Sequence, residues 1–148
     1  MSIKEELQQA IKEAVKSRDE LRKECLRMAK GAVLMKEKES AKDEVLSEEA
    51  VIQVLRTEVK KRQQSSETFR EVGKTEEADK SLAEAAIIEE FLPSQLSEAQ
   101  LEEKVRAYLE AHPDVNHAGK LTGAMKKELG DQADGKVLNQ VCRKALEG

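Results

Sequence analysis

The chain has 148 residues, of which 38% are charged and 2% aromatic, and only 2 prolines and 7 glycines interrupt it. This composition predicts an all-α protein and excludes a large β-sheet. The formal net charge of −4 argues against a protein that binds nucleic acid over its whole surface, since such a surface would be basic.

The cysteines and the apolar runs indicate the compartment. Cys25 and Cys142 lie far apart and each falls in an apolar helical pattern, which favours two reduced core residues over a disulfide or a metal pair. The first residues do not resemble a signal peptide, and no apolar run has the length that a bilayer requires. We therefore expect a soluble, cytoplasmic protein.

An antiparallel hairpin of two helices is predicted at the start of the chain. Ser2 and Ser17 each begin a capping-box pattern, with Glu5 and Glu20 three residues later, so a helix should follow each serine. The apolar positions of the first helix are Ile3, Leu7, Ala10, Ile11, Ala14 and Val15. Those of the second helix are Leu21, Cys25, Met28, Ala29, Ala32 and Val33.

A polar connection over residues 40–44 leads to a third helix, which Ser47 should cap. Because residues 60–66 have no apolar stripe of their own, we expect this end of the helix to project and to be mobile. Gly73 should end it, and Thr75 should cap a fourth helix. The inward positions are Val51, Val54, Leu55 and Val59 in the third helix, and Ala78, Leu82, Ala85, Ile88, Phe91 and Leu92 in the fourth.

The chain is predicted to turn at Pro93, which divides it into a four-helix domain of residues 1–93 and a three-helix bundle of residues 94–148. Proline lacks an amide hydrogen and disfavours helix before it, so the fourth helix should end one or two residues earlier. Ser97 and Gln100 form a capping box that starts the next helix. The apolar residues on both sides of the break are expected to pack together as one corner; they are Phe91, Leu92 and Leu96.

Three shorter helices are predicted in the second domain. The first should end near His112, because a proline follows it. The second should run from Ala118 to Leu129, and Asp134 should cap the third. Their apolar positions are Leu101, Val105, Tyr108 and Leu109, then Leu121, Ala124, Met125 and Leu129, then Val137, Leu138, Val141, Cys142 and Ala145.

Three sequence blocks in this half carry a family resemblance. They are the runs 90–97 (EFLPSQLS), 119–125 (GKLTGAM) and 133–136 (ADGK). Together with Lys60-Lys61-Arg62 and Phe69 in the first half, their order and spacing resemble the signature of the GatB/YqeY family. The resemblance covers the whole chain.

The resemblance implies a helical N-terminal domain followed by a three-helix domain similar to the C-terminal tail of the B subunit of aspartyl/glutamyl-tRNA amidotransferase. In that enzyme the tail domain contacts tRNA, while amide transfer occurs elsewhere. The chain departs from the family pattern at Thr122, where methionine is usual, and at residues 130–132, where a Gly-Lys pair is usual. The change to Asp131 weakens the phosphate binding expected there.

Two motifs allow more than one interpretation. Gly119, Gly123 and Gly135 are compatible with a phosphate-binding helix start, but their spacing is that of neither a P-loop nor a dinucleotide fingerprint. For Gly119 and Gly123, one helical turn apart, close packing of two helices is the favoured interpretation. His112 and His117 flank turn residues, which favours a surface loop over a metal site. We predict no metal and no cofactor.

Our leading hypothesis is an RNA-binding adaptor, with tRNA as the expected RNA. From residue 115 onward the chain has 6 basic and 4 acidic residues, a local charge of 6 − 4 = +2. The candidate phosphate contacts are the lysines of the C-terminal bundle: Lys120, Lys126, Lys127, Lys136 and Lys144.

Two alternatives remain open. One is a carbon–nitrogen ligase that uses glutamine as amide donor, alone or with amidotransferase subunits. It rests on the family kinship, since the sequence presents no nucleophile beside a base and we predict no catalytic residue. The other is a protein-interaction module in which the end of the third helix docks a partner.

Overall fold

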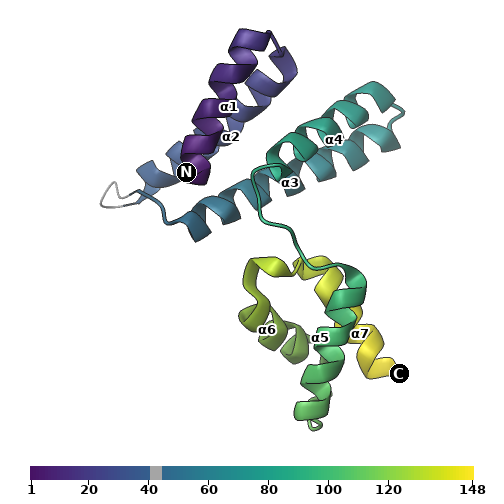
Figure 1. Cartoon of the computed structure of the whole chain (residues 1–148). Coiled ribbons are helices and arrows are strands. Elements are labelled where there is room, and N and C mark those ends of the chain that lie inside the picture. Colours follow the sequence, from purple (N-terminus) through teal and green to yellow (C-terminus); the bar gives the residue numbers. More distant parts are fainter. Residues whose placement is uncertain (41–44) are drawn as a thin grey trace. The chain divides into compact units, whose positions relative to one another are not determined.

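The computed structural model describes residues 1–40 and 45–148. In this part of the chain there are seven α-helices, one 3-10 turn and no strand, so the all-α prediction is confirmed. The predicted connection after Ser40 lies outside the described residues. The helices are α1 (Ile3–Ser17), α2 (Glu20–Glu39), α3 (Glu48–Glu71), α4 (Thr75–Glu89), α5 (Glu98–Ala111), α6 (Ala118–Leu129) and α7 (Gly135–Glu147), with the turn η1 (Gly130–Gln132) before α7 (Figure 1).

The chain forms two compact units, Met1–Leu92 with α1 to α4 and Pro93–Gly148 with α5 to α7. Each unit has its own core of buried aliphatic side chains. Across the described ranges, no helix combines the length and the hydrophobicity needed to cross a bilayer. The largest fully buried side chains are Leu7, Leu26, Leu55 and Ile88 in the first unit, and Leu101, Leu121, Met125 and Leu138 in the second.

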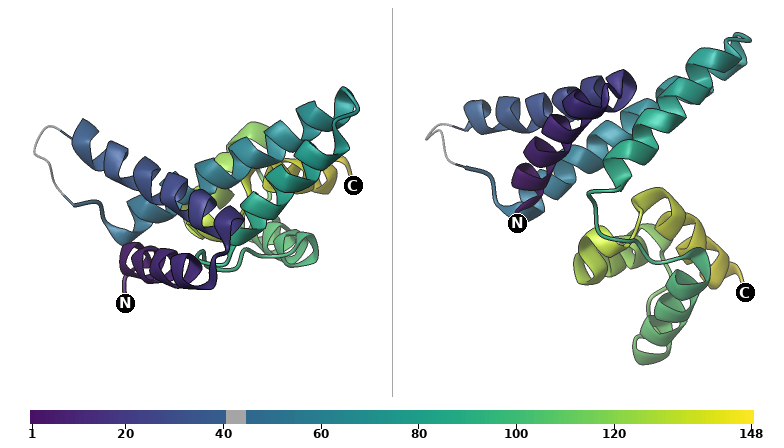
Figure 2. Two further views of the ribbon diagram at one scale, coloured as in Figure 1. Left: turned by 90° about the horizontal axis from the view of Figure 1, so that it is seen from above. Right: turned by 45° about the horizontal axis from the view of Figure 1, so that its top comes forward.

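The first unit consists of two helical hairpins, α1 with α2 and α3 with α4, which Figures 1 and 2 show from different sides. Arg18 ends α1 in a left-handed conformation with φ of 61°. The Asp19 carboxylate then accepts a hydrogen bond from the Arg22 amide at 3.1 Å and caps α2. The predicted cap at Ser17 is therefore wrong, because Ser17 still belongs to α1 and the carboxylate two residues later stands at the helix start.

The buried face of α2 differs from its predicted stripe. Leu26, which the stripe did not include, is fully buried, whereas Leu21 and Met28 are 37% and 60% exposed. The last residue of the α1 stripe, Val15, is also 48% exposed. The inward face of α2 is turned by about one residue, because the helix packs against α1 on one side and against α3 and α4 on another.

The C-terminal half of α3 is not solvated on every side. It lies along α4, and two polar residues face the contact: Arg62 is 8% exposed and Ser66 is 3% exposed. The small buried Ala78 and Ser81 of α4 complete this surface. The prediction that residues 60–66 have no inward face was wrong, because it treated every polar residue as solvated.

Arg62 provides the main polar contact of the second hairpin. Its Nε donates to the Glu84 carboxylate of α4 at 3.2 Å, and its Nη1 donates to the Glu58 carboxylate at 3.1 Å. The three side chains are 9%, 20% and 12% exposed, respectively. The charges are thus largely withdrawn from water, and the single cation is shared by two carboxylates.

Replacing Arg62 with methionine should lower the free energy of unfolding of the protein by about 3 kcal/mol, because two poorly hydrated carboxylates lose their cation. Urea denaturation followed by circular dichroism measures this change. The control is Lys61→Met, since Lys61 also pairs with Glu58 but is 66% exposed; it should change stability by less than about 0.5 kcal/mol. Equal effects of the two variants would contradict the role of Arg62.

The turn between α3 and α4 is only partly as predicted. Gly73 follows the end of α3 with φ of 77°, a conformation that glycine adopts without strain. Thr75 is the first residue of α4 and not its cap; the cap position is Lys74, whose side chain makes no capping hydrogen bond. Leu82, predicted to face inward, is 44% exposed.

Glu37 connects three elements of the first unit. Its carboxylate accepts from Lys4 Nζ of α1 at 2.8 Å and from the Leu46 amide, just before α3, at 3.2 Å. The hydrogen bond from Lys4, followed by that from Leu46, holds the pKa of Glu37 below its usual range. Both bonds require the ionised form of the carboxylate.

The Glu37→Gln variant should therefore be less stable than the unchanged protein at pH 7, and the difference should disappear in acid. A carboxyl whose pKa is lowered by folding stabilises the fold above its unfolded pKa, and this stabilisation is lost as the pH falls through the folded value. Unfolding free energies measured between pH 7 and pH 3 test this. The exposed Glu13→Gln variant is the control; a pH-independent difference for Glu37 would contradict the assignment.

The junction between the units is less helical than predicted. α4 ends at Glu89, and Phe91 and Leu92 form a turn whose amides donate to the carbonyls of Ile88 and Glu89. Phe91 and Leu92 pack on the core of the first unit. Leu96 packs on that of the second.

In the second unit the sequence predicted the helix starts well. Ser97 and Gln100 form the reciprocal capping box. α6 has the predicted bounds, and the Asp134 carboxylate caps α7 by accepting from the Val137 amide at 3.1 Å. The segment before α5 is tied to η1, because the Leu96 amide donates to the Gln132 carbonyl at 2.7 Å.

Candidate nucleic-acid interface

The five candidate lysines lie on two adjacent helices of the second unit, and all are exposed. Lys120 and Lys127 lie on α6 seven residues apart. Seven residues are close to two helical turns, which places both lysines on one side of the helix about 10 Å apart. This side is turned away from Leu121 and Met125, the buried residues of α6.

Lys126 has a different role. Its ammonium donates to the Ala133 carbonyl, the residue between η1 and the cap of α7. The contact fixes the chain between α6 and α7, so it competes with any phosphate for the same ammonium. Sequence reasoning could not separate Lys126 from Lys127, because the distinction depends on which side of α6 the returning chain covers.

The two lysines of α7 occupy different electrostatic surroundings. Lys136 lies in the first turn, next to the capping carboxylate of Asp134. Lys144 lies in the last turn, 72% exposed, with its Nζ 3.9 Å from a carboxylate oxygen of Glu98 in α5. A separation of this length is a loose ion pair that water and salt weaken.

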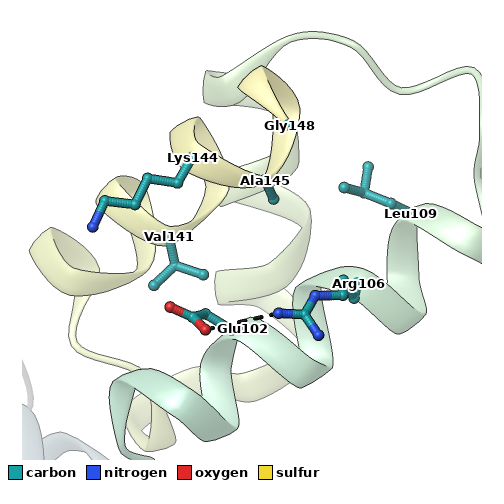
Figure 3. A pocket seen from close by; sticks show the side chains of 7 residues that line it. All are labelled: Glu102, Arg106, Leu109, Val141, Lys144, Ala145 and Gly148. Atoms are coloured by element: carbon teal, nitrogen blue, oxygen red, sulfur yellow. Dashed lines mark ion pairs between the residues drawn. The ribbon is translucent and has the colours of Figure 1, made fainter.

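A groove runs between α5 and α7 beside Lys144 (Figure 3). Its volume is about 490 Å³, and Leu109, Val141 and Ala145 form its apolar lining. Figure 3 shows Val141 and Ala145 facing α5, whereas the Lys144 side chain extends away from Arg106. Lys144 therefore borders this groove rather than pointing into it.

The start of α6 is capped by a histidine. The Nδ1 atom of His117 accepts a hydrogen bond from the Lys120 amide at 3.3 Å. A Cβ atom on Gly119 would come within 3.0 Å of the His117 ring, so glycine leaves room for the ring to fold over the helix start. The sequence placed His117 in a loop and did not identify this role, because histidine is an uncommon N-cap.

The favoured interpretation of the glycines is wrong. A Cβ atom on Gly123 would have nothing within 4 Å, so this glycine does not mediate close packing of two helices. The same is true of Gly135 at the start of α7. Gly119 meets only the ring of His117. Besides the apolar core that they share, α6 and α7 are joined by a polar contact, in which Asn139 Nδ2 donates to Thr122 Oγ1 at 3.3 Å.

The family of the chain is decided by a match along almost its entire length. A family model described as Yqey-like protein matches residues 4–146. The chain belongs to the Yqey-like protein family. A search of curated proteins finds no match.

Two of the three sequence blocks that carry the resemblance meet at η1 in the second unit. The first block supplies Gln95, whose side chain donates to the Asp131 carbonyl at 3.0 Å. The third block begins at Ala133 and includes the cap of α7. The second block forms the first two turns of α6, where Lys120 lies. The structure thus brings the first and third blocks together around η1, whereas the second block begins at the other end of α6.

His112 and His117 lie at the ends of helices, His112 at the end of α5 and His117 at the start of α6. His112 stacks on Tyr108 with ring centroids 4.1 Å apart, and its Nδ1 lies 3.0 Å from the Tyr108 carbonyl oxygen at the end of α5. Among the described residues, no three His, Cys, Asp or Glu side chains come together in a way that could hold a metal ion.

Both cysteines are buried free thiols. Burial raises the pKa of Cys25 to about 11, although the neighbouring Arg62 opposes the shift. Burial also raises the pKa of Cys142, against a hydrogen bond from Thr122. Reactive cysteines have lowered pKa values, so these environments are those of structural residues.

The native protein should therefore resist thiol reagents. Relative to the ordinary value of 9.0, a pKa of about 11 leaves Cys25 with roughly 100-fold less thiolate at neutral pH, and burial restricts access further. Mass spectrometry after iodoacetamide treatment at pH 8 should show neither cysteine labelled in the native protein and both labelled in urea. Rapid labelling of Cys25 in the folded protein would contradict this assignment.

Proposed function

We propose that the protein is an RNA-binding adaptor that contacts phosphates through α6, with tRNA as its RNA. The observation that carries the proposal is the pair Lys120 and Lys127, which share one exposed side of α6. In the described ranges neither ammonium takes part in an ion pair with a carboxylate of the protein. Two such lysines about 10 Å apart can contact two phosphates of one RNA strand or groove.

The remaining lysines contribute differently. Lys136 is exposed at the start of α7 and extends the basic surface. Lys144 adds charge, but Glu98 partly neutralises it. Lys126 acts through the backbone contact that holds α6 and α7 in place. The resemblance of this unit to a tRNA-contacting tail domain supports the choice of tRNA.

The Lys120→Ala/Lys127→Ala double variant should weaken binding of bulk tRNA and reduce its salt dependence. Two lost phosphate contacts should make the slope of log K against log salt shallower by about 1.5. Fluorescence anisotropy with labelled tRNA between 50 and 200 mM salt, roughly the range over which such contacts are visible, measures both quantities.

The matched control is Lys12→Ala/Lys16→Ala, which removes the same charge from exposed positions of α1. If this control reduced the slope as strongly, a general charge effect would explain the result and the placement on α6 would be wrong. If the unchanged protein bound no tRNA at about 50 mM salt, the proposed function itself would be wrong.

The alternatives have weaker support. The carbon–nitrogen ligase hypothesis still rests on family kinship alone. The interaction hypothesis relied on a projecting end of α3, and that end instead packs against α4. We therefore place the interaction with RNA first.

A further inference from the structure

Arg143 of α7 is an exposed cation that forms no ion pair and no hydrogen bond with the described part of the chain. Even Glu147, one turn later on α7, forms no ion pair with it among the described residues. The next residue, Lys144, is by contrast loosely paired with Glu98 of α5. The guanidinium of Arg143 can therefore bind a group from outside the protein without losing a contact within it.

The later residues of α7 lie beside the start of α6. Near the turn that joins the two helices, the Lys126 ammonium donates to the backbone carbonyl that precedes the cap of α7. One turn earlier on α6, Thr122 accepts from Asn139 and makes a hydrogen bond with Cys142. Moving backward along α6 thus corresponds to moving forward along α7. The residue after Cys142 is Arg143, so it lies near the first two turns of α6.

Arg143 lies at the solvent-exposed edge of the contact between α6 and α7. Asn139 is four residues earlier on the same side of α7, and it faces α6. The buried residues Leu138 and Val141 occupy the core side of the helix. Lys136, seven residues before Arg143, is exposed near the other end of the same edge.

The exposed surface of α6 is low where it faces this edge. In the first two turns of α6, the exposed positions between Thr122 and the side that carries the lysines are Gly119 and Gly123. A Cβ atom on Gly123 would have nothing within 4 Å, whereas one on Gly119 would meet the ring of His117. One polyanion can therefore contact the lysines of α6 and also reach Arg143.

We propose that Arg143 is a further phosphate contact of the RNA-binding surface, and that this surface crosses from α6 onto α7. The inference rests on the proposed function and adds to it a residue outside the five candidate lysines. A guanidinium can donate two parallel hydrogen bonds to one phosphate, whereas an ammonium acts as a point charge. Arg143 thus holds the RNA backbone on α7, while Lys120 and Lys127 contact it on α6.

Binding of labelled bulk tRNA to the full chain, followed by fluorescence anisotropy between about 50 and 200 mM salt, tests this inference. Arg143→Ala should weaken binding about threefold to tenfold and make the slope of log K against log salt shallower by about 0.75, because one phosphate contact is lost. Arg143→Lys should keep the slope, because the charge remains. It should still weaken binding about twofold to fivefold, because the bidentate contact is lost.

The matched control is Arg106→Ala, which removes an arginine from α5 of the same unit. Arg106 is 72% exposed, and its guanidinium lies 3.9 Å from a carboxylate oxygen of Glu102. Its removal should leave the salt slope unchanged, because α5 lies outside the proposed surface. Urea denaturation should show unchanged stability for both alanine variants, since neither arginine makes a buried contact.

Unchanged affinity and slope in Arg143→Ala, equal effects of Arg143→Ala and Arg106→Ala, or full affinity in Arg143→Lys would each overturn the inference. Weakened binding in Lys120→Ala/Lys127→Ala together with normal binding in Arg143→Ala would overturn this inference alone. Absence of tRNA binding by the unchanged protein would overturn both the proposed function and the inference.

Discussion

The first unit depends on a cation buried between two helices. Beyond Val59, α3 has no large aliphatic side chain facing α4, and Arg62 takes that place by bonding to Glu58 and Glu84. The carbonyl of Glu84 in turn accepts a hydrogen bond from Cys25 Sγ of α2 at 3.4 Å. This polar centre lies beside the aliphatic core that the four helices share, and it fixes the register of α4 against α3 more specifically than apolar packing alone would.

The second unit shows how a family signature can have a structural origin. Gln95 and Leu96 bond to η1, the Lys126 ammonium bonds to Ala133, and the cap of α7 follows directly. These contacts together hold η1 and the start of α7 in place. Candidate partner-binding residues are therefore the exposed side chains that make no such structural contact. On α6 these candidates are Lys120 and Lys127.

Local signals predicted most of the helix starts, whereas burial of charge could not be predicted. The caps at Ser47, Ser97 and Asp134 were predicted correctly, because each capping residue and the amide it accepts from lie within four residues of sequence. Arg62 was interpreted as part of a solvated run, because its partner Glu84 lies 22 residues away. The structural role of Lys126 was missed for the same reason: its acceptor belongs to a chain segment that only the fold brings back.

The errors on α2 have a different cause. Leu21 and Met28 were predicted to face the core because they follow helical spacing with Cys25, yet Leu26 and Ala29 face it instead. The helix thus has two neighbouring apolar faces, and the four helices of the first unit cover only one of them. A second exposed apolar face lowers the solubility of a protein and promotes its aggregation unless another surface covers that face.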